Sequence, residues 1–127
     1  MELLTSCWKR IREVEPNLNA FITIAEKEAI AQAKKADKLF SASDLSSLSP
    51  LLGTPIALKD LYSTAGIKTT AGSRVLENYI PVYAATAVKR LKEAGAIIIG
   101  KNNCDAWAHG SSGENSDFGP TKNPFNL

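Results

Sequence analysis

Apolar residues recur with a helical period in two stretches of the first 40 residues. The first stretch predicts an amphipathic helix that ends at Pro16-Asn17, where proline interrupts the hydrogen-bond ladder. One face of this helix carries Leu4, Trp8, Ile11, Glu15 and Leu18. The second stretch predicts a helix over 25–40, whose packing face carries Ala25, Ala29, Ala33, Ala36 and Phe40. Residues 18–24 are either extended or the entry to that second helix, and the pattern leaves both open.

Two short apolar runs farther along the chain predict buried strands. The first, 56–58, follows a glycine and a proline and stops at two opposite charges, and the second, 96–100, is almost wholly aliphatic. A third helical stripe lies between them over 84–94, and Gly95 stands where a helix C-cap belongs. Strand, helix and strand in this order make a βαβ unit, so we expect a sheet that is at least partly parallel.

The segments between these elements are rich in loop-forming residues. Serine occupies half of 41–50, which is typical of a flexible surface connection. Residues 62–72 are loop-like, with several threonines and glycines. The polar part that follows the second strand predicts a short helical turn over 104–108, with Asn103 as its cap.

Length and composition are those of a globular domain or a part of one. The chain has 127 residues, 44% hydrophobic and 22% charged, which is enough to bury a real core. We divide it into a helical part (1–40), a serine-rich connection (41–52) and a βαβ core (53–127). A parallel sheet with so few strands leaves edges and faces bare, so the sequence is expected to be a portion of a larger domain and marginally stable alone.

Charge and cysteine content exclude several classes of protein. A net charge of +2 gives no reason to expect bulk attraction to nucleic acid or to a membrane. The aliphatic runs are too short to span a bilayer, and residues 1–10 lack the order of a secretion signal. Cys7 and Cys104 are far apart and form no disulfide framework. These features predict a cytoplasmic protein with reduced thiols.

Lys59 is the first candidate for chemistry. It ends the first predicted strand, at the edge where α/β sheets hold their ligand crevices. Partial desolvation there disfavours the ammonium and lowers the pKa of the amine, so that a proton-accepting form is reached near neutral pH. The alternative is a strand-end lysine that extends into water or pairs with Asp60, and these residues alone do not separate the two.

Two further motifs do not predict a site. Residues 95–102 nearly match the phosphate-binding loop, but the intervening residues are strand-like and Asn102 replaces the hydroxyl that binds magnesium. Cys104, Asp105 and His109 cluster, yet a structural zinc site needs four nitrogen or sulfur ligands. We therefore expect a buried thiol, a locally hydrogen-bonded imidazole and no metal.

The stretch Gly110-Ser111-Ser112-Gly113 allows close approach of a ligand to the backbone, although taken alone it predicts only a turn. In combination with other stretches it resembles the amidase signature family of amide hydrolases, with the strongest likeness to the tRNA-dependent amidotransferase members. The resemblance covers nearly the whole chain and is most specific in 53–60, 69–74, 94–102, 110–116 and 118–124.

The resemblance implies a fold and a mechanism. The fold is α/β, the N-terminal part of an α/β/α sandwich in which helices flank a mixed sheet, incomplete in this chain. The family uses a Ser–cisSer–Lys triad, and Lys59 falls on the position of its lysine. The resemblance further implies that Lys59 takes a proton from a bridging serine, which activates a nucleophilic serine. Gly110, Ser111 and Ser112 match a loop beside the active site and are pocket candidates.

The tRNA-dependent members imply a substrate and partners as well. Glutamine is hydrolysed to glutamate, and the ammonia passes to a partner protein that amidates Glu-tRNA(Gln) or Asp-tRNA(Asn). The resemblance implies partners of the B and C types, with tRNA reached through the complex. It implies no cofactor in the present chain, whereas ATP and magnesium belong to the partner. Such a glutaminase is one component of a ligase of protein biosynthesis.

The sequence departs from the family pattern in two ways. His109 stands where methionine is common and Gly113 where threonine is usual, so the pocket differs in shape. The serine-bearing stretches of the family follow beyond the last residue given, so the 127 residues hold one of three triad members and are expected to be inactive alone. The alternatives are another amidase, acting on small or fatty amides, and a non-catalytic interaction fragment.

Overall fold

The computed structural model describes residues 1–125. Its helices are α1 (Glu2–Leu18), α2 (Glu26–Ala42) and α3 (Thr86–Glu93), and its strands are β1 (Phe21–Ile24), β2 (Pro55–Lys59) and β3 (Ile97–Asn102). Three short 3-10 turns accompany them, namely η1 (Leu45–Ser47), η2 (Arg74–Leu76) and η3 (Ala106–Ala108). Within the described part no helix has the length and apolar character needed to cross a membrane.

The sheet is mixed, with strand order β1-β3-β2. β2 and β3 are parallel and are joined through α3, which confirms the predicted βαβ unit. β1 pairs antiparallel with the other side of β3, so of the two possibilities for residues 18–24 the extended one is observed for 21–24. The part over 1–40, expected to be helical, therefore also contributes a strand. The most apolar strand, β3, is therefore central, as expected for a strand that is covered on both faces.

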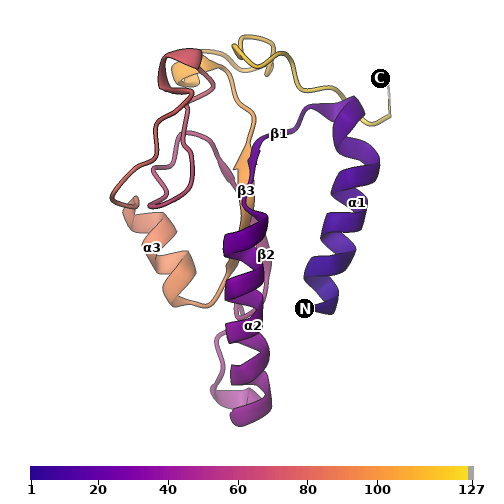
Figure 1. The fold of residues 1–127 in the computed structure, drawn as a ribbon, viewed down its shortest axis with the longest axis vertical. Coiled ribbons are helices and arrows are strands. Elements are labelled where there is room, and N and C mark those ends of the chain that lie inside the picture. Colours follow the sequence, from indigo (N-terminus) through magenta and orange to yellow (C-terminus); the bar gives the residue numbers. More distant parts are fainter. Residues whose placement is uncertain (126–127) are drawn as a thin grey trace.

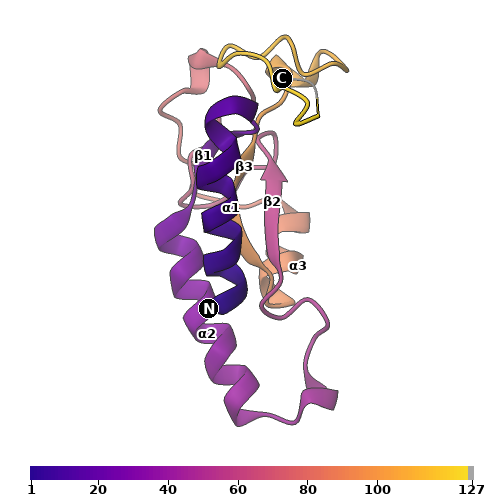
Figure 2. The same ribbon diagram turned by 90° about the vertical axis from the view of Figure 1, so that its right-hand side faces the viewer.

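Helices cover both faces of the sheet (Figure 1). Figure 2 shows α1 in front of the sheet and α3 behind it. On the first face, Leu4 and Trp8 of α1 pack with alanines of α2 and with Ile97 and Ile99 of β3. On the other face, Val88 of α3 packs against Leu58 and Ile98. These two cores confirm the α/β/α arrangement inferred from the sequence.

The ends of the helices follow the sequence signals in one case and depart from them in another. Gly95 has φ 85°, its N–H donates to the Lys92 carbonyl at 3.0 Å, and the Ala96 N–H donates to the Leu91 carbonyl at 3.0 Å. This is the paired bonding of a Schellman cap, as the sequence predicts for α3. The predicted end of the first helix at Pro16-Asn17 is one residue early, because α1 continues to Leu18.

Asn19 explains why α1 continues past its proline. A proline removes one backbone donor, which is a small loss in the last turn of a helix. Asn19 then closes α1 in the left-handed conformation, with φ 54° and its N–H 3.0 Å from the Glu15 carbonyl. The Glu15 carboxylate accepts the Phe21 N–H at 2.7 Å, so the helix end and the start of β1 are held together. The predicted packing face of α2 holds for its alanines, whereas Phe40 is 43% exposed.

The segment after β3 returns across the top of the sheet to the corner between α1 and β1 (Figures 1 and 2). The Asn19 amide donates to the carbonyls of Phe118 and Gly119, both at 3.0 Å, and the Lys122 N–H donates to the Leu18 carbonyl at 2.8 Å. The predicted capping role of Asn103 is wrong. Its amide instead donates to the carbonyls of Asn19 and Gly119, and Asp105 precedes η3.

Candidate active site

The carboxyl ends of β2 and β3 lie at one edge of the sheet, and the chain's candidate functional residues gather there. Lys59 is the last residue of β2 and lies opposite Asn102, the last residue of β3. Its carbonyl accepts the Tyr62 N–H at 3.1 Å, which closes a turn over 59–62. The Lys59 side chain is exposed. The predicted desolvation of Lys59 is therefore wrong for this chain. The structure agrees instead with the alternative interpretation, a strand-end lysine that extends into water.

A second lysine, Lys101, occupies the kind of buried position that the sequence pattern predicts for Lys59. Its side chain is 0% exposed, although it lies near the end of a strand. An irregular step in the β2–β3 pairing explains where it points. Ile56 lies opposite Ile98, but Ala57 lies opposite Gly100, so β3 has one extra residue at this point.

This bulge reverses the alternation of side chains along β3. Without it, Lys101 would share a face with Ile97 and Ile99, which pack against α1 and α2. With it, Lys101 lies opposite Leu58, whose side chain belongs to the core beneath α3. Lys101 therefore points toward the α3 side, whereas alternation along β2 directs Lys59, the residue after Leu58, to the other side.

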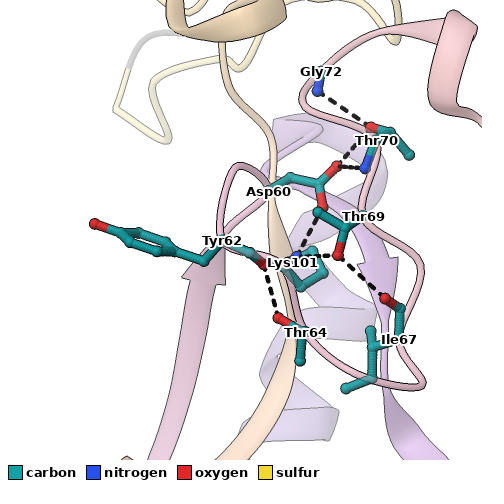
Figure 3. Close-up of polar contacts among 8 residues, drawn as sticks. All are labelled: Asp60, Tyr62, Thr64, Ile67, Thr69, Thr70, Gly72 and Lys101. Carbon is teal, nitrogen blue, oxygen red and sulfur yellow. Dashed lines mark hydrogen bonds and ion pairs between the residues drawn. The ribbon is translucent and has the colours of Figure 1, made fainter. Parts of the chain in front are cut away.

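Three oxygen atoms surround the Lys101 ammonium (Figure 3). Its Nζ donates to the Tyr62 carbonyl at 2.8 Å and to Thr69 Oγ1 at 2.8 Å, and it lies 3.1 Å from Asp60 Oδ1. Two of the three donors of this ammonium thus make hydrogen bonds, and the contact with Asp60 Oδ1 is an ion pair without a hydrogen bond. Burial lowers the pKa of Lys101, and the negative charge of Asp60 works against that lowering.

Asp60 is as buried as Lys101 and is held on both sides (Figure 3). Its Oδ2 accepts the Thr70 N–H at 2.8 Å and the Thr70 hydroxyl at 2.5 Å. Its backbone N–H donates to the Asn102 carbonyl at 3.1 Å, and its carbonyl accepts the Ala71 N–H at 3.0 Å. The residue that follows Lys59 is thus fixed to β3 and to the loop over 69–72.

The loop over 69–72 packs tightly against the segment that follows β3. A Cβ added to Gly72 would collide with the Cys104 carbonyl oxygen, so only glycine fits there. The Trp107 N–H donates to the Ala71 carbonyl at 2.8 Å. Ala71 and Trp107 both have positive φ, 55° and 57°, a conformation that costs free energy in residues with a Cβ. Backbone strain is concentrated at this edge of the sheet.

Asp105 organises the loop that holds the pocket candidates. Its carboxylate accepts the Asn115 N–H at 2.8 Å and the Gly113 N–H at 3.0 Å. These two bonds lower its pKa, and the positive charge of Lys59 adds to the lowering, which places Lys59 within electrostatic reach of this loop. A Cβ on Gly110 would lie 2.5 Å from Asp105 Cγ, so the loop folds closely over the carboxylate. Ser111 and Ser112 are exposed on the same loop.

The remaining candidates do not form a reactive pair. Cys104 is 6% exposed, and burial followed by the negative charge of Asp60 raises the pKa of its thiol, which confirms the predicted buried thiol. His109 is exposed, and no hydrogen bond of its imidazole is found among residues 1–125, so the expected local bond is absent there. Over the same residues no three potential metal ligands come together. Residues 97–102 lie in β3, in agreement with the rejection of a phosphate-binding loop.

Comparison with known proteins identifies the family of the chain. Residues 2–127 match the sequence model of the family described as Amidase. The chain belongs to the amidase family. It is 53% identical over 118 residues to the A-type component of glutamyl-tRNA(Gln) amidotransferase from Geobacter metallireducens, covering 93% of this chain and 24% of the relative. It is 54% identical over 127 residues to the same component from Roseiflexus sp. strain RS-1, covering all of this chain and 26% of the relative.

Solved structures of amidases agree with the fold of this amidase chain. The A-type component of the Thermotoga maritima glutamyl-tRNA(Gln) amidotransferase superposes with a TM-score of 0.74 at 38% identity, over 94% of this chain and 23% of the other. A peptide amidase bound to the competitive inhibitor chymostatin superposes with a TM-score of 0.86 at 32% identity, over 98% of this chain and 26% of the other. The amidase chain thus spans about a quarter of the length of the curated relatives it matches.

Sequence reasoning misses the buried pair of Asp60 and Lys101 in this amidase chain. It treats Asp60 only as a partner for Lys59, and Lys101 only as part of a phosphate-binding motif. The available signal is a lysine that directly continues the most apolar run of the chain, 96–100. A charge in such a place must be paired, and Asp60, which directly follows the neighbouring strand of the predicted βαβ unit, is one candidate.

Proposed function

We propose that Lys59 is the general base of an amide-hydrolysing Ser–cisSer–Lys site in the glutaminase component of a tRNA-dependent amidotransferase. One observation carries the proposal. About half of the residues are identical to the A-type amidotransferase relatives over the whole chain, and Lys59 ends β2 at the edge of the sheet where ligands bind in α/β folds.

The contrast between the two lysines supports Lys59 in this role. Lys101 is 0% exposed, and its ammonium is already engaged by the Tyr62 carbonyl, the Thr69 hydroxyl and the Asp60 carboxylate, so no room is left for a further segment to reach it. Lys59 is exposed at the same edge, where a further segment has room to approach it. We infer that the segments bearing the two serines cover Lys59 and provide the desolvation that favours a neutral amine.

In the proposed reaction a proton moves along three side chains. The neutral Lys59 amine accepts the proton of the bridging serine, which accepts that of the nucleophilic serine as its oxygen attacks the glutamine side-chain amide. Lys59 then returns its proton through the bridging serine to the leaving nitrogen, the C–N bond breaks, ammonia leaves and an acyl-enzyme remains on the nucleophilic serine. Water then attacks the acyl carbon and gives a proton through the bridging serine to Lys59. The ester bond breaks, the nucleophilic serine regains that proton, and glutamate is released. Of the three triad side chains, residues 1–127 are proposed to contribute only the lysine and therefore to be inactive alone.

The assembly is part of the same proposal. Ammonia is passed to a partner protein that holds ATP and magnesium and amidates Glu-tRNA(Gln) or Asp-tRNA(Asn). B- and C-type partners complete the cytoplasmic complex, and tRNA is bound through them. Ser111 and Ser112 are proposed to line the glutamine pocket, because Asp105 fixes their loop within electrostatic reach of Lys59.

A second candidate is hydrolysis of peptide or other small amides. The superposition on peptide amidase, with a TM-score of 0.86, favours it, although sequence identity is higher to the amidotransferase relatives. In this case the lysine has the same role and the ammonia is released to solvent.

A substrate comparison separates the two candidates. The proteins to use are the full-length product of the gene and a chimera in which this chain replaces the matching 127 residues of the Roseiflexus sp. RS-1 relative. Ammonia release is measured with glutamine and with C-terminal peptide amides, with and without the B- and C-type partners. We expect glutamine to be preferred and its hydrolysis to increase in the complex. Preference for peptide amides, or no hydrolysis by the full-length product, would contradict the amidotransferase assignment.

A further inference from the structure

The buried ion pair of Asp60 and Lys101 has no part in the proposed chemistry. Both side chains are 0% exposed, and their charged atoms lie 3.1 Å apart. Removing two charges from water is costly, and apolar residues of similar volume often stabilise a protein at least as well. A pair retained at such a cost is expected to do something that packing alone does not do.

The Lys101 side of the pair holds the turn that follows Lys59. This turn is closed by the bond from the Tyr62 N–H to the Lys59 carbonyl, and Lys101 Nζ binds the Tyr62 carbonyl. The same Nζ binds the hydroxyl of Thr69, across the loop (Figure 3). One ammonium thus joins the turn over 59–62 to the loop over 69–72.

The Asp60 side of the pair holds the same loop from the adjacent residue. Its carboxylate receives both the N–H and the hydroxyl of Thr70, and its carbonyl receives the Ala71 N–H. Lys59 and Asp60 are neighbours, so displacement of Asp60 would also displace the Cα of Lys59. An apolar pair would fill the space but would provide none of these directional bonds.

We propose that Lys101, paired with Asp60, is a positioning residue that holds the turn over 59–62 on the loop over 69–72 and so fixes the direction in which the Lys59 side chain extends. The inference rests on the proposed function of Lys59. The bulge in β3 is part of the device, because it places Lys101 on the α3 side, beneath the turn. Lys101 itself touches no substrate.

Four variants test this proposal in the full-length product and in the chimera. Asp60→Leu combined with Lys101→Met replaces the pair by apolar residues. Thr69→Val keeps the pair but removes one acceptor of Nζ, and Thr69→Ser restores a hydroxyl at that place. Thr23→Val is the matched control, because Thr23 lies opposite Lys101 on β1 and its buried hydroxyl has no hydrogen-bond partner among the described residues.

Two readouts separate positioning from simple stability. Hydrogen exchange reports the amides of Tyr62, Thr70 and Ala71, and steady-state amide hydrolysis reports kcat and KM. In the double variant and in Thr69→Val, we expect faster exchange at these amides and a fall in kcat of about 10- to 100-fold. KM should stay within about threefold of the parent, because the groups that bind substrate are unchanged. Thr69→Ser and Thr23→Val should match the parent in both readouts.

Each other outcome is decisive. A folded double variant with the kcat of the parent overturns the proposal, as does a lower kcat with unchanged exchange. Faster exchange with unchanged kcat shows that the turn does not position Lys59, and it also overturns the proposal. If the parent hydrolyses no amide, the proposed function fails. Hydrogen exchange at the amides of Tyr62, Thr70 and Ala71 then decides alone whether the pair holds the turn. Unchanged exchange in both Thr69→Val and the double variant refutes the claim that the pair holds the turn.

Discussion

Lys59 and Lys101 stand at the carboxyl ends of neighbouring parallel strands, yet their surroundings are opposite. Lys59 is exposed, whereas Lys101 is buried with a carboxylate, a hydroxyl and a carbonyl around its ammonium. The difference arises from one extra residue in β3, which turns Lys101 toward the α3 core. Position at a strand end therefore does not determine what a lysine does. The number of acceptors around the amine and its access to other groups determine it.

The largest expected effect is the loss of turnover when the exposed lysine, Lys59, is removed. Lys59→Ala in the full-length protein should lower amide hydrolysis by about 10²- to 10⁴-fold, because the proton acceptor of the triad is removed. Lys89→Ala, which removes an exposed lysine of α3, is the control and should keep the turnover of the parent. Both variants should unfold at the temperature of the parent. Retention of a tenth of the parent's turnover by Lys59→Ala would refute the assigned role.

The next effect lies on the Lys101 side and concerns stability. Lys101→Met alone should lower the free energy of unfolding by about 3–5 kcal/mol, because it leaves the Asp60 carboxylate buried without a cation. Adding Asp60→Leu should return the free energy of unfolding to the value of the parent or above it. Urea unfolding of the parent, the single variant and the double variant measures both quantities. A single variant as stable as the parent would show that water reaches Asp60 and that the pair is not buried.

Much of the fold follows from the sequence because it depends on local periodicity. The alanine face of α2, the strands β2 and β3 and the glycine that ends α3 are all visible as patterns. The pattern places the end of α1 one residue early, and it gives no sign that the side-chain amide of Asn19, the residue that closes the helix, binds carbonyls of residues 118–120, about a hundred positions away. Such tertiary contacts leave no mark in a local pattern.

The site is less accessible to sequence reasoning, for a related reason. Strict alternation along β3 assigns Lys101 to the face of Ile97, and the bulge that reverses this is a property of the pairing with β2. Lys59 can be placed at the end of its strand, but what covers it cannot be deduced. The roles of Asp60, Thr69 and Thr70 emerge only when the loop after β2 is seen folded back on β3.

A smaller effect concerns pH and the loop beside Lys59. The pKa of Asp105 is lowered by the N–H groups of Asn115 and Gly113, so its carboxylate stabilises the folded state above the unfolded pKa, and this contribution is lost as pH falls through the lower folded pKa. Asp105→Asn should therefore be less stable than the parent at neutral pH, and the difference should shrink below pH 3.8. Denaturant unfolding at several pH values measures it. Glu93→Gln, at the end of α3, is the control, and a pH-independent difference for Asp105→Asn would contradict this origin.

The smallest expected effect is on substrate binding by the loop over 110–113. Ser112→Ala should raise KM for glutamine by about fivefold with little change in kcat, the loss of a single hydrogen bond to bound substrate. Ser49→Ala, in the distant connection between α2 and β2, is the matched control. Steady-state kinetics of the full-length protein gives both constants. A change in kcat alone would place Ser112 outside the binding pocket.

Chemical rescue is the most direct test of the claim that the exposed lysine, and not the buried one, accepts the proton. Glutamine hydrolysis by Lys59→Ala and by the Asp60→Leu, Lys101→Met double variant is measured while ethylamine is added at increasing concentration. We expect ethylamine to restore turnover to Lys59→Ala in a saturable manner and to leave the turnover of the double variant unchanged. Rescue of the double variant, with none for Lys59→Ala, would contradict this claim.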